Sequence, residues 1–220
     1  MYHYIGELPA DADEYRVNLT VTPSQFETHL SYLQQNGYTT VTLDDLDAAL
    51  QAGQPLPPKP IVLTFDDGHL DHYTNAFPAL QRFGFSGTFF VITGLLDVDH
   101  PNYINWEQAQ EMEAAGMRIE PHTKSHLQLN DRGAEFLVYE VLGSIESVEA
   151  HLNRRPQMFS YPAGRYDEQT LSVVEAAGVR RAVTTQPGQQ HTTDNRLELR
   201  RVRISGDTTA IGLHYILNSG

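Results

Sequence analysis

Apolar residues recur along the chain with two different periods, and their alternation predicts a mixed fold of helices and strands. Phe26, Leu30 and Leu33 form an apolar stripe at helical spacing. Thr22 can cap this helix at its start, and Gly37 can close it. The segment between Thr22 and Gly37 is therefore predicted to be an amphipathic helix.

Similar stripes with capping residues and closing glycines predict the remaining helices. These are expected at Leu43–Ala52, in a segment ending near Gly84, at Asn105–Ala115, Ala134–Asn153 and Asp167–Ala177, and from a cap at Asp207 through Ile216. Short apolar runs predict strands near Met1–Tyr4, Tyr38–Val41, Ile61–Phe65, Gly87–Ile92, Met117–Glu120, Gln157–Tyr161, Val179–Thr184 and Leu197–Ile204. Helices alternating with about seven strands predict an α/β fold, an irregular β/α barrel in one domain over residues 1–220.

Composition then narrows the classes of partner. The net charge is −13, and only 15 Lys and Arg residues are spread through 220 positions. A nucleic-acid or anionic-membrane partner would favour basic clusters, so we expect neither, and we expect a neutral or cationic substrate. The chain has no cysteine. A transition-metal site must therefore use His, Asp or Glu ligands.

Targeting signals are not visible in the sequence. No stretch approaches the roughly 20 apolar residues that a membrane span needs. The segment Met1–Ala10 lacks the basic and apolar regions of a signal peptide. A trimmed piece of an exported protein would look the same, because strand-like residues begin at once, and the sequence leaves the compartment unknown.

A first candidate for chemistry is the pair Asp66 and Asp67, which follows the apolar run Ile61–Phe65 and precedes Gly68. This places both carboxylates at the carboxyl end of a buried strand, where barrel enzymes react. The glycine turn can swing the second carboxylate toward the first, so that one binds a divalent ion and the other takes a proton from water. A plain surface turn is the competing interpretation of this tripeptide.

A second candidate is the pair His122 and His126, just after the predicted strand ending at Glu120. A spacing of four residues places both imidazoles on one side if the segment forms a helical turn. Solvated or core histidines are the alternative. His69, Asp71 and His72 could line the same cleft, although solvated loop positions are the default expectation for them.

The third candidate is the segment Phe159–Tyr166, again a strand that runs into a Pro-Gly turn. Its backbone N–H groups could meet an oxyanion. The ordered Asp-Asp, His-x-x-x-His and Tyr-Pro-x-Gly elements resemble a polysaccharide deacetylase of carbohydrate esterase family 4, over nearly the whole chain. Flanking segments resemble the branch of bacterial poly-N-acetylglucosamine deacetylases: Met1–His3, Phe26–Val41, Gly87–Phe90 and Leu199–Arg203.

The resemblance implies a role for each matched position. Asp67, His122 and His126 would bind a divalent metal, usually zinc, with cobalt or another ion possible, and Asp66 would be the general base. The Tyr161 backbone N–H would help to stabilise the oxyanion. The substrate would be an N-acetylated glycan, the products acetate and a free amine, and the location extracytoplasmic or at the cell surface.

The sequence departs from this family in two places. The family pattern opens the third motif with an arginine that orients the base, but Ser160 stands before Tyr161 here. We expect Arg201 to supply that cation instead. The late Leu213–His214 match falls in a predicted helix, so we expect it to be accidental, and His3 is our candidate for a histidine beside the site, with its exact role open.

Two other functions stay open at this point. The same metal chemistry could act on a small acetylated amide or ester instead of a polysaccharide. Alternatively, the chain could be a non-catalytic carbohydrate-binding domain that keeps the fold without turnover. The sequence does not identify the glycan, the native metal, the general acid or the oligomeric state.

Overall fold

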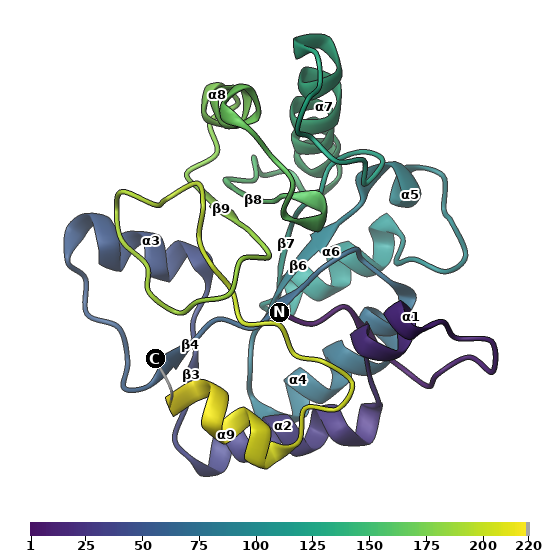
Figure 1. The fold of residues 1–220 in the computed structure, drawn as a ribbon, viewed down its shortest axis with the longest axis vertical. Coiled ribbons are helices and arrows are strands. Elements are labelled where there is room, and N and C mark those ends of the chain that lie inside the picture. Colours follow the sequence, from purple (N-terminus) through teal and green to yellow (C-terminus); the bar gives the residue numbers. More distant parts are fainter. Residues whose placement is uncertain (219–220) are drawn as a thin grey trace.

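The computed structural model describes residues 1–218 and confirms a mixed α/β chain, with short strands at the centre and helices around them (Figure 1). The strands are β1 (Tyr4–Ile5), β2 (Thr20–Val21), β3 (Thr39–Thr40), β4 (Pro60–Ile61), β5 (Thr64–Phe65), β6 (Thr88–Val91), β7 (Arg118–Pro121), β8 (Met158–Ser160) and β9 (Arg181–Val183). The α-helices are α1 (Glu14–Leu19), α2 (Pro23–Gln35), α3 (Leu43–Ala52), α4 (Phe77–Phe83), α5 (Thr93–Asp97), α6 (Trp106–Ala114), α7 (Ala134–Leu152), α8 (Glu168–Ala176) and α9 (Ala210–Asn218). A π-helical turn covers His72–Ala76, and a 3₁₀ turn covers Pro162–Gly164.

All the strand pairs are parallel, as the alternating pattern predicts. Over residues 1–218 they form four small sheets: β1-β2, β3-β4, β5-β6-β7 and β8-β9. Isolated bridges join Tyr2 to Phe65 and Val183 to Leu199. This pairing does not establish the closed barrel that the sequence analysis expects.

Most predicted elements are present, but three are not as expected. The single strand predicted at Ile61–Phe65 is divided into β4 and β5. The strand predicted at Leu197–Ile204 is wrong, because only an isolated bridge forms there, at Leu199. The last helix begins at Ala210, and the Thr209 hydroxyl, not Asp207, accepts a bond from its first turn, from the Gly212 N–H at 3.1 Å.

The core fixes the register of the central sheet. Phe65 on β5 and Phe89 on β6 are fully buried partners whose rings stack at 4.5 Å between centroids. The ring of Tyr2, which forms an isolated bridge with Phe65, also stacks on the Phe65 ring, with 5.4 Å between centroids. Aromatic burial of this kind stabilises a small sheet strongly. The residues that directly follow Phe65 therefore lie at the carboxyl end of β5. Asp66 and Asp67 are those residues.

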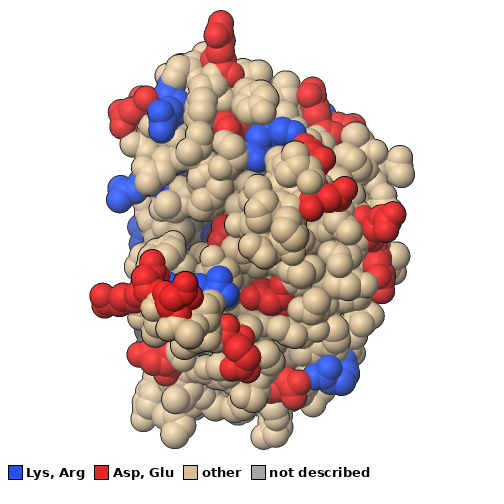
Figure 2. All heavy atoms as spheres, turned by 90° about the vertical axis from the view of Figure 1, so that its right-hand side faces the viewer, with Lys and Arg blue, Asp and Glu red and all other residues tan. Residues whose placement is uncertain are grey.

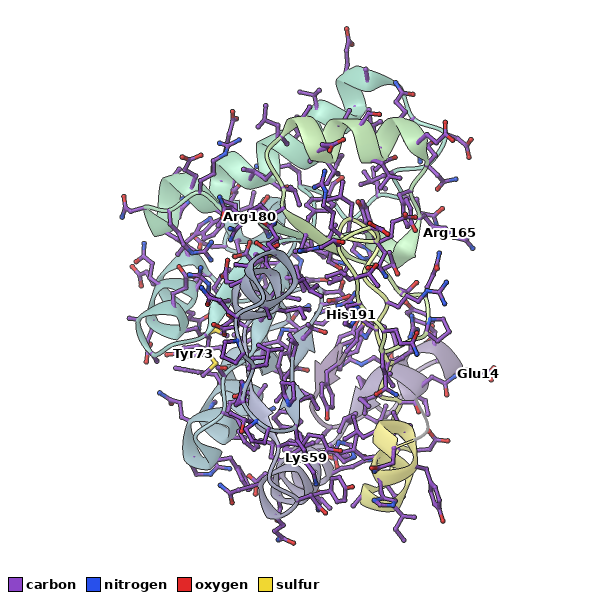
Figure 3. The ribbon with its side chains drawn as sticks, turned by 90° about the vertical axis from the view of Figure 1, so that its left-hand side faces the viewer. Glu14, Lys59, Tyr73, Arg165, Arg180 and His191 are labelled. Atoms are coloured by element: carbon purple, nitrogen blue, oxygen red, sulfur yellow. The ribbon has the colours of Figure 1, made fainter. Side chains whose placement is uncertain are left out.

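The surface matches the acidic composition. Figure 2 shows acidic side chains spread over one face of the molecule, with basic side chains fewer among them. Several basic residues are used in ion pairs; Arg180, labelled in Figure 3, lies beside α3 and pairs with Asp44 at 3.0 Å and Asp47 at 3.2 Å. Within residues 1–218, none of the helices combines the length and apolar character that crossing a bilayer would need.

Candidate metal centre and acid–base site

The turn after β5 aims two carboxylates in different directions. Asp66 is still extended from the strand, and its N–H donates to the Tyr2 carbonyl at 3.0 Å. Asp67 itself takes a left-handed backbone conformation, with φ 81°, and Gly68 follows with φ 79°. A Cβ on Gly68 would lie 3.1 Å from Val91 Cγ1, and this tight contact together with the left-handed backbone favours glycine there. The strained backbone of Asp67, which costs about 1–3 kcal/mol in such cases, turns its carboxylate toward β7.

The two histidines come from the loop after β7, and the expected helical turn is wrong. Residues 122–126 are irregular, and both Thr123 (φ 67°) and His126 (φ 60°) have left-handed backbones. These two reversals bring the rings of His122 and His126 to 5.0 Å between centroids. The pair predicted from spacing is therefore formed by a different local geometry.

Asp67, His122 and His126 form a compact group of potential ligands. One ligand atom from each lies within 4.8 Å of the others. Asp67 Oδ1 is 3.5 Å from His122 Nε2 and 3.2 Å from His126 Nε2. Two ligands of a tetrahedral zinc ion, each about 2.0–2.1 Å from the metal, are separated by roughly 3.3 Å. The group fits a divalent ion.

Hydrogen bonding sets the tautomer of His122. Its Nδ1–H donates to the Ser160 carbonyl at 2.7 Å, inside the protein. A neutral imidazole that donates from Nδ1 presents its Nε2 lone pair, which is the atom that faces Asp67. Two imidazoles and one carboxylate suit zinc, cobalt and similar ions better than calcium or magnesium.

Mutual contacts shift the pKa values within this group. Burial alone would raise the pKa of Asp67, but its close contacts with His122, His126 and His69 hold it well below its ordinary value. Burial would lower the pKa of His126, and the bond to Asp67 raises it instead. Asp67 is therefore an anionic ligand at neutral pH.

Asp66 is held by Arg201 in a buried, two-pronged ion pair. Arg201 Nη1 donates to Asp66 Oδ1 at 2.7 Å, and Nη2 donates to Oδ2 at 2.6 Å. Nη2 also donates to the Ser160 hydroxyl at 3.1 Å, and Nε donates to the Thr184 carbonyl at 2.9 Å. Arg201 therefore contacts Asp66, as the sequence analysis expected. Its guanidinium also contacts Ser160, the residue that stands where the family pattern has an arginine.

The ion pair keeps Asp66 charged. Burial would raise the pKa of Asp66, but the charge and hydrogen bonds of Arg201 hold it below its ordinary value of 3.8. Asp66 is 1% exposed and Arg201 is 7% exposed, so water screens the pair little. Asp66 can therefore accept a proton at neutral pH, and its orientation is fixed.

The third motif lies where the sequence places it, but its predicted donor is occupied. Tyr161 is buried directly after β8, and its N–H donates to the Val183 carbonyl at 3.2 Å. This bond continues the β8-β9 ladder. The prediction of a free Tyr161 N–H for an oxyanion is therefore not met in this structure.

His3 lies beside the two carboxylates. It is 7% exposed, and its Nδ1 has no hydrogen-bond partner among the described residues. Burial lowers its pKa to about 4, against the opposing charges of Asp66 and Asp67. The ring is therefore neutral over most of the pH range and can accept a proton there.

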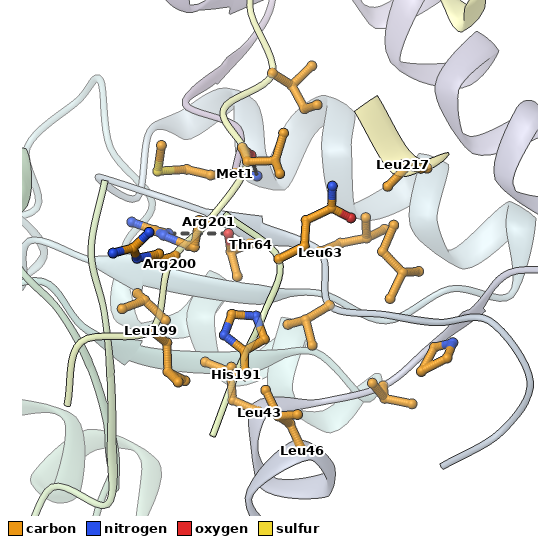
Figure 4. Close-up of a pocket in the computed structure, with 18 of the residues that line it drawn as sticks. Met1, Leu43, Leu46, Leu63, Thr64, His191, Leu199, Arg200, Arg201 and Leu217 are labelled. Carbon is orange, nitrogen blue, oxygen red and sulfur yellow. Dashed lines mark hydrogen bonds between the residues drawn. The ribbon is translucent and has the colours of Figure 1, made fainter. Parts of the chain in front are cut away.

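A largely apolar cavity of about 450 Å³ is lined in part by Arg201. Figure 4 shows it in close-up. Its walls include Leu43, Leu63, Leu199 and Leu217, and it reaches Thr64 and Arg201. The ligand group Asp67, His122 and His126 is not among its lining residues. The cavity is therefore separate from the potential metal ligands.

Glu140 on α7 is a site residue that the sequence analysis missed. It is 1% exposed, and its Oε2 accepts the N–H groups of Lys124 at 3.1 Å and Ser125 at 3.0 Å. Its other oxygen accepts the Ser125 hydroxyl. One helical carboxylate thus holds the loop between His122 and His126. The available signal was an acidic residue at helical spacing from the apolar residue Leu137, because Glu is rarely buried without partners.

Replacing Glu140 should loosen that loop. Glu140→Ala leaves the partly buried N–H groups of Lys124 and Ser125 without their acceptor, so we expect about 1–3 kcal/mol less unfolding free energy in urea. We also expect weaker zinc binding by the metal-free protein in a competition titration. Glu146→Ala, at an exposed position of the same helix, is the matched control. Equal zinc affinity in both variants would show that Glu140 does not order the loop.

The sequence of this chain matches the model of a known protein family. The polysaccharide deacetylase family model matches residues 53–182, which include both aspartates, both histidines and the Tyr-Pro turn. The chain belongs to the polysaccharide deacetylase family. The resemblance stated from its motifs is confirmed, and so is its likeness to proteins named poly-β-1,6-N-acetyl-D-glucosamine N-deacetylases.

Three similar proteins illustrate the extent of the match. YxkH of Bacillus subtilis, whose name assigns it provisionally to the polysaccharide deacetylases, is 34% identical over 86% of this chain and 67% of its own length. The poly-β-1,6-N-acetyl-D-glucosamine N-deacetylase of Escherichia coli K12 is 30% identical over 55% of this chain, which spans only 20% of that protein. The structure of the Streptococcus pyogenes deacetylase PplD, in complex with acetate, superposes with a TM-score of 0.92 at 28% identity, covering 99% of this chain and 96% of that one.

Proposed function

We propose that this polysaccharide deacetylase is a metal-dependent hydrolase that removes N-acetyl groups from an N-acetylglucosamine-containing polysaccharide and releases acetate. The observation that carries the proposal is the placement of two separate functions on adjacent residues. Asp67 faces His122 and His126, while Asp66 faces Arg201. In this proposal the potential metal ligands and the base would lie side by side at one strand end.

Each residue has a distinct task in this reaction. Asp67, His122 and His126 would hold the divalent ion, which when bound supplies Lewis-acid polarisation of the acetyl carbonyl and acidifies the attacking water. Asp66, kept ionised and oriented by Arg201, accepts the proton of that water. The amine must gain a proton as it leaves, and the proton that Asp66 takes from the water balances this step. His3, a neutral imidazole beside the carboxylates, could accept that proton and relay it to the amine.

The substrate class rests on the relatives and on charge. The Escherichia coli and Staphylococcus aureus relatives are named for a β-1,6-linked N-acetylglucosamine polymer. Such a glycan is neutral before deacetylation and cationic afterwards, which suits a chain of net charge −13. This substrate would place the protein outside the cytoplasm, at or near the cell surface.

Removing one histidine should abolish metal binding. His122→Ala deletes an Nε2 ligand and should leave no zinc on the protein after gel filtration, measured by atomic emission, with acetate release lost as well. His214→Ala is the control, because His214 is exposed on α9 and bonds Tyr32 at 2.9 Å. Zinc retained at full stoichiometry by His122→Ala would contradict the proposed ligand set.

A substrate panel tests the choice of substrate. Acetate release should be measured from a β-1,6-linked N-acetylglucosamine oligomer, chitin oligomers, peptidoglycan and small acetylated amides or esters. We expect an oligosaccharide to be favoured in kcat/KM. A preference for the small compounds would replace the glycan with a small substrate. Measured glycan binding without acetate release, with zinc present, would instead indicate a carbohydrate-binding domain.

A further inference from the structure

His69 makes a contact with the potential metal ligands that its loop position does not suggest. The sequence analysis expected a solvated residue, but His69 is 7% exposed. Its Nε2 lies 3.3 Å from Asp67 Oδ2, the oxygen that does not face His122 and His126. Among the described residues this buried nitrogen makes no hydrogen bond of good geometry, and Asp67 Oδ2 is the acceptor that lies within reach of it. The two oxygens of one carboxylate therefore face different neighbours.

The backbone around His69 is fixed on both sides. His69 forms an isolated antiparallel bridge with Tyr103. The Leu70 N–H donates to the Asn102 carbonyl at 2.9 Å, and the Ile104 N–H donates to the Gly68 carbonyl at 3.0 Å. The position of the His69 ring relative to Asp67 is therefore determined by a second loop that is remote in sequence.

The ring of His69 is also clamped through its face. Tyr4 on β1 stacks on it, with 3.9 Å between centroids and 20° between planes. The guanidinium carbon of Arg16 lies 3.2 Å from the centroid of the Tyr4 ring. Tyr103 lies at 5.0 Å from His69. A stack of this order restricts rotation of the imidazole and keeps Nε2 directed at Asp67.

We propose that His69 is a positioning residue for the metal ligand Asp67. By donating from Nε2 to Oδ2, it reserves that oxygen and presents Oδ1 alone to the ion. This inference rests on the proposed function, because it assumes that Asp67 binds the metal. Hydrogen bonds to a ligating carboxylate orient it and tune its strength as a ligand. His69 would do this here, with Tyr4 and Arg16 holding its ring.

Zinc affinity of the metal-free protein tests the inference without any assay of activity. His69→Phe keeps a ring against Tyr4 and removes the donor, so we expect zinc binding about 10–100-fold weaker by competition titration. His69→Gln keeps a donor N–H and should recover most of the affinity. His100→Phe is the matched control, since His100 contacts Tyr103 but is not among the groups that contact Asp67. Its affinity should equal that of the wild type.

A cobalt spectrum separates positioning from a general structural effect. With Co²⁺ in place of zinc, His69→Phe should change the visible absorption bands, because a released Oδ2 changes the coordination of the ion. His69→Gln and His100→Phe should keep the wild-type bands. If His69→Phe does not fold, His69→Met replaces it as the variant without a donor.

The outcomes are distinguishable. Wild-type zinc affinity and an unchanged cobalt spectrum in the variant without a donor would overturn the role of His69 and leave the proposed function intact. A wild-type protein that binds neither zinc nor cobalt would overturn the proposed function and this inference with it. Weak binding by His69→Phe, recovered by His69→Gln, supports the inference.

Discussion

Asp66→Asn should retain its metal and lose about 10²–10⁴-fold in the rate of acetate release. The substitution keeps the size of the side chain but removes the carboxylate that accepts a proton from water. The metal should stay, because Asp67, His122 and His126 are the residues that lie within ligand distance of one another. The measurements are kcat from released acetate and the zinc content of the purified variant.

The control for this variant is Asp194→Asn, which removes the same charge from an exposed loop. Its kcat and zinc content should match the wild type. A fully active Asp66→Asn enzyme would show that the base is another residue. A variant that lost its zinc would show that Asp66 belongs to the ligand set.

Arg201→Met should have the largest effect on stability. The substitution leaves Asp66 buried without its cation, and removal of one partner from a buried ion pair costs about 3–5 kcal/mol. Arg201→Lys keeps a charge but cannot make two parallel hydrogen bonds, so its free energy of unfolding should lie between those of the wild type and Arg201→Met. Urea unfolding near pH 7 measures the difference. Arg203→Met, at an exposed position of the same segment, should unfold like the wild type.

The effect of Arg201→Met should depend on pH with a defined sign. In the wild type, the pKa of Asp66 lies below its ordinary value of 3.8, so its contribution to stability is complete above that value and is lost as pH falls through the lower folded pKa. Without Arg201, burial should raise the pKa of Asp66. The variant then loses stability as pH rises through that raised pKa. Its stability deficit should therefore grow with pH, below pH 3.8 because the wild type gains stability and above that value because the variant loses it. The activity should be shifted toward higher pH.

A deficit that stays constant between acid and neutral pH would contradict this electrostatic account. It would indicate that Arg201 acts through packing alone. An unchanged pH profile of kcat in Arg201→Lys and a shifted profile in Arg201→Met would support the assignment of the cation to Asp66.

Local sequence signals predicted the helices well and the strands less well. Leu43–Ala52 is helical over its whole predicted length, because Thr42, Asp45 and Gly53 supply the cap, the capping box and the left-handed end. The segment Leu197–Ile204 has the apolar residues that predict a strand, but it has no continuous strand partner among residues 1–218. Pairing depends on distant segments, and an apolar run alone does not say whether a neighbour will be in register.

The candidate site was only partly predictable, because its motifs are local in sequence but the contacts around them are not. Motif order placed Asp66, Asp67, His122 and His126 together at strand ends, and the structure brings them together. The residues that contact them are not motif positions: Glu140 lies on α7 and accepts the Ser125 N–H, and His69 lies in the turn two residues after Asp67. Their roles depend on backbone reversals and stacking that no spacing rule contains. Positive φ at Asp67 and His126 is one example.

The most direct test of the central claim is acetate release by metal-stripped protein before and after reconstitution. The protein would be stripped with a chelator, its metal content verified, and its activity measured on an N-acetylglucosamine oligomer with and without added zinc or cobalt. We predict no release from the stripped protein and restored release at one ion per chain. Full acetate release by protein verified to be free of metal would contradict the account.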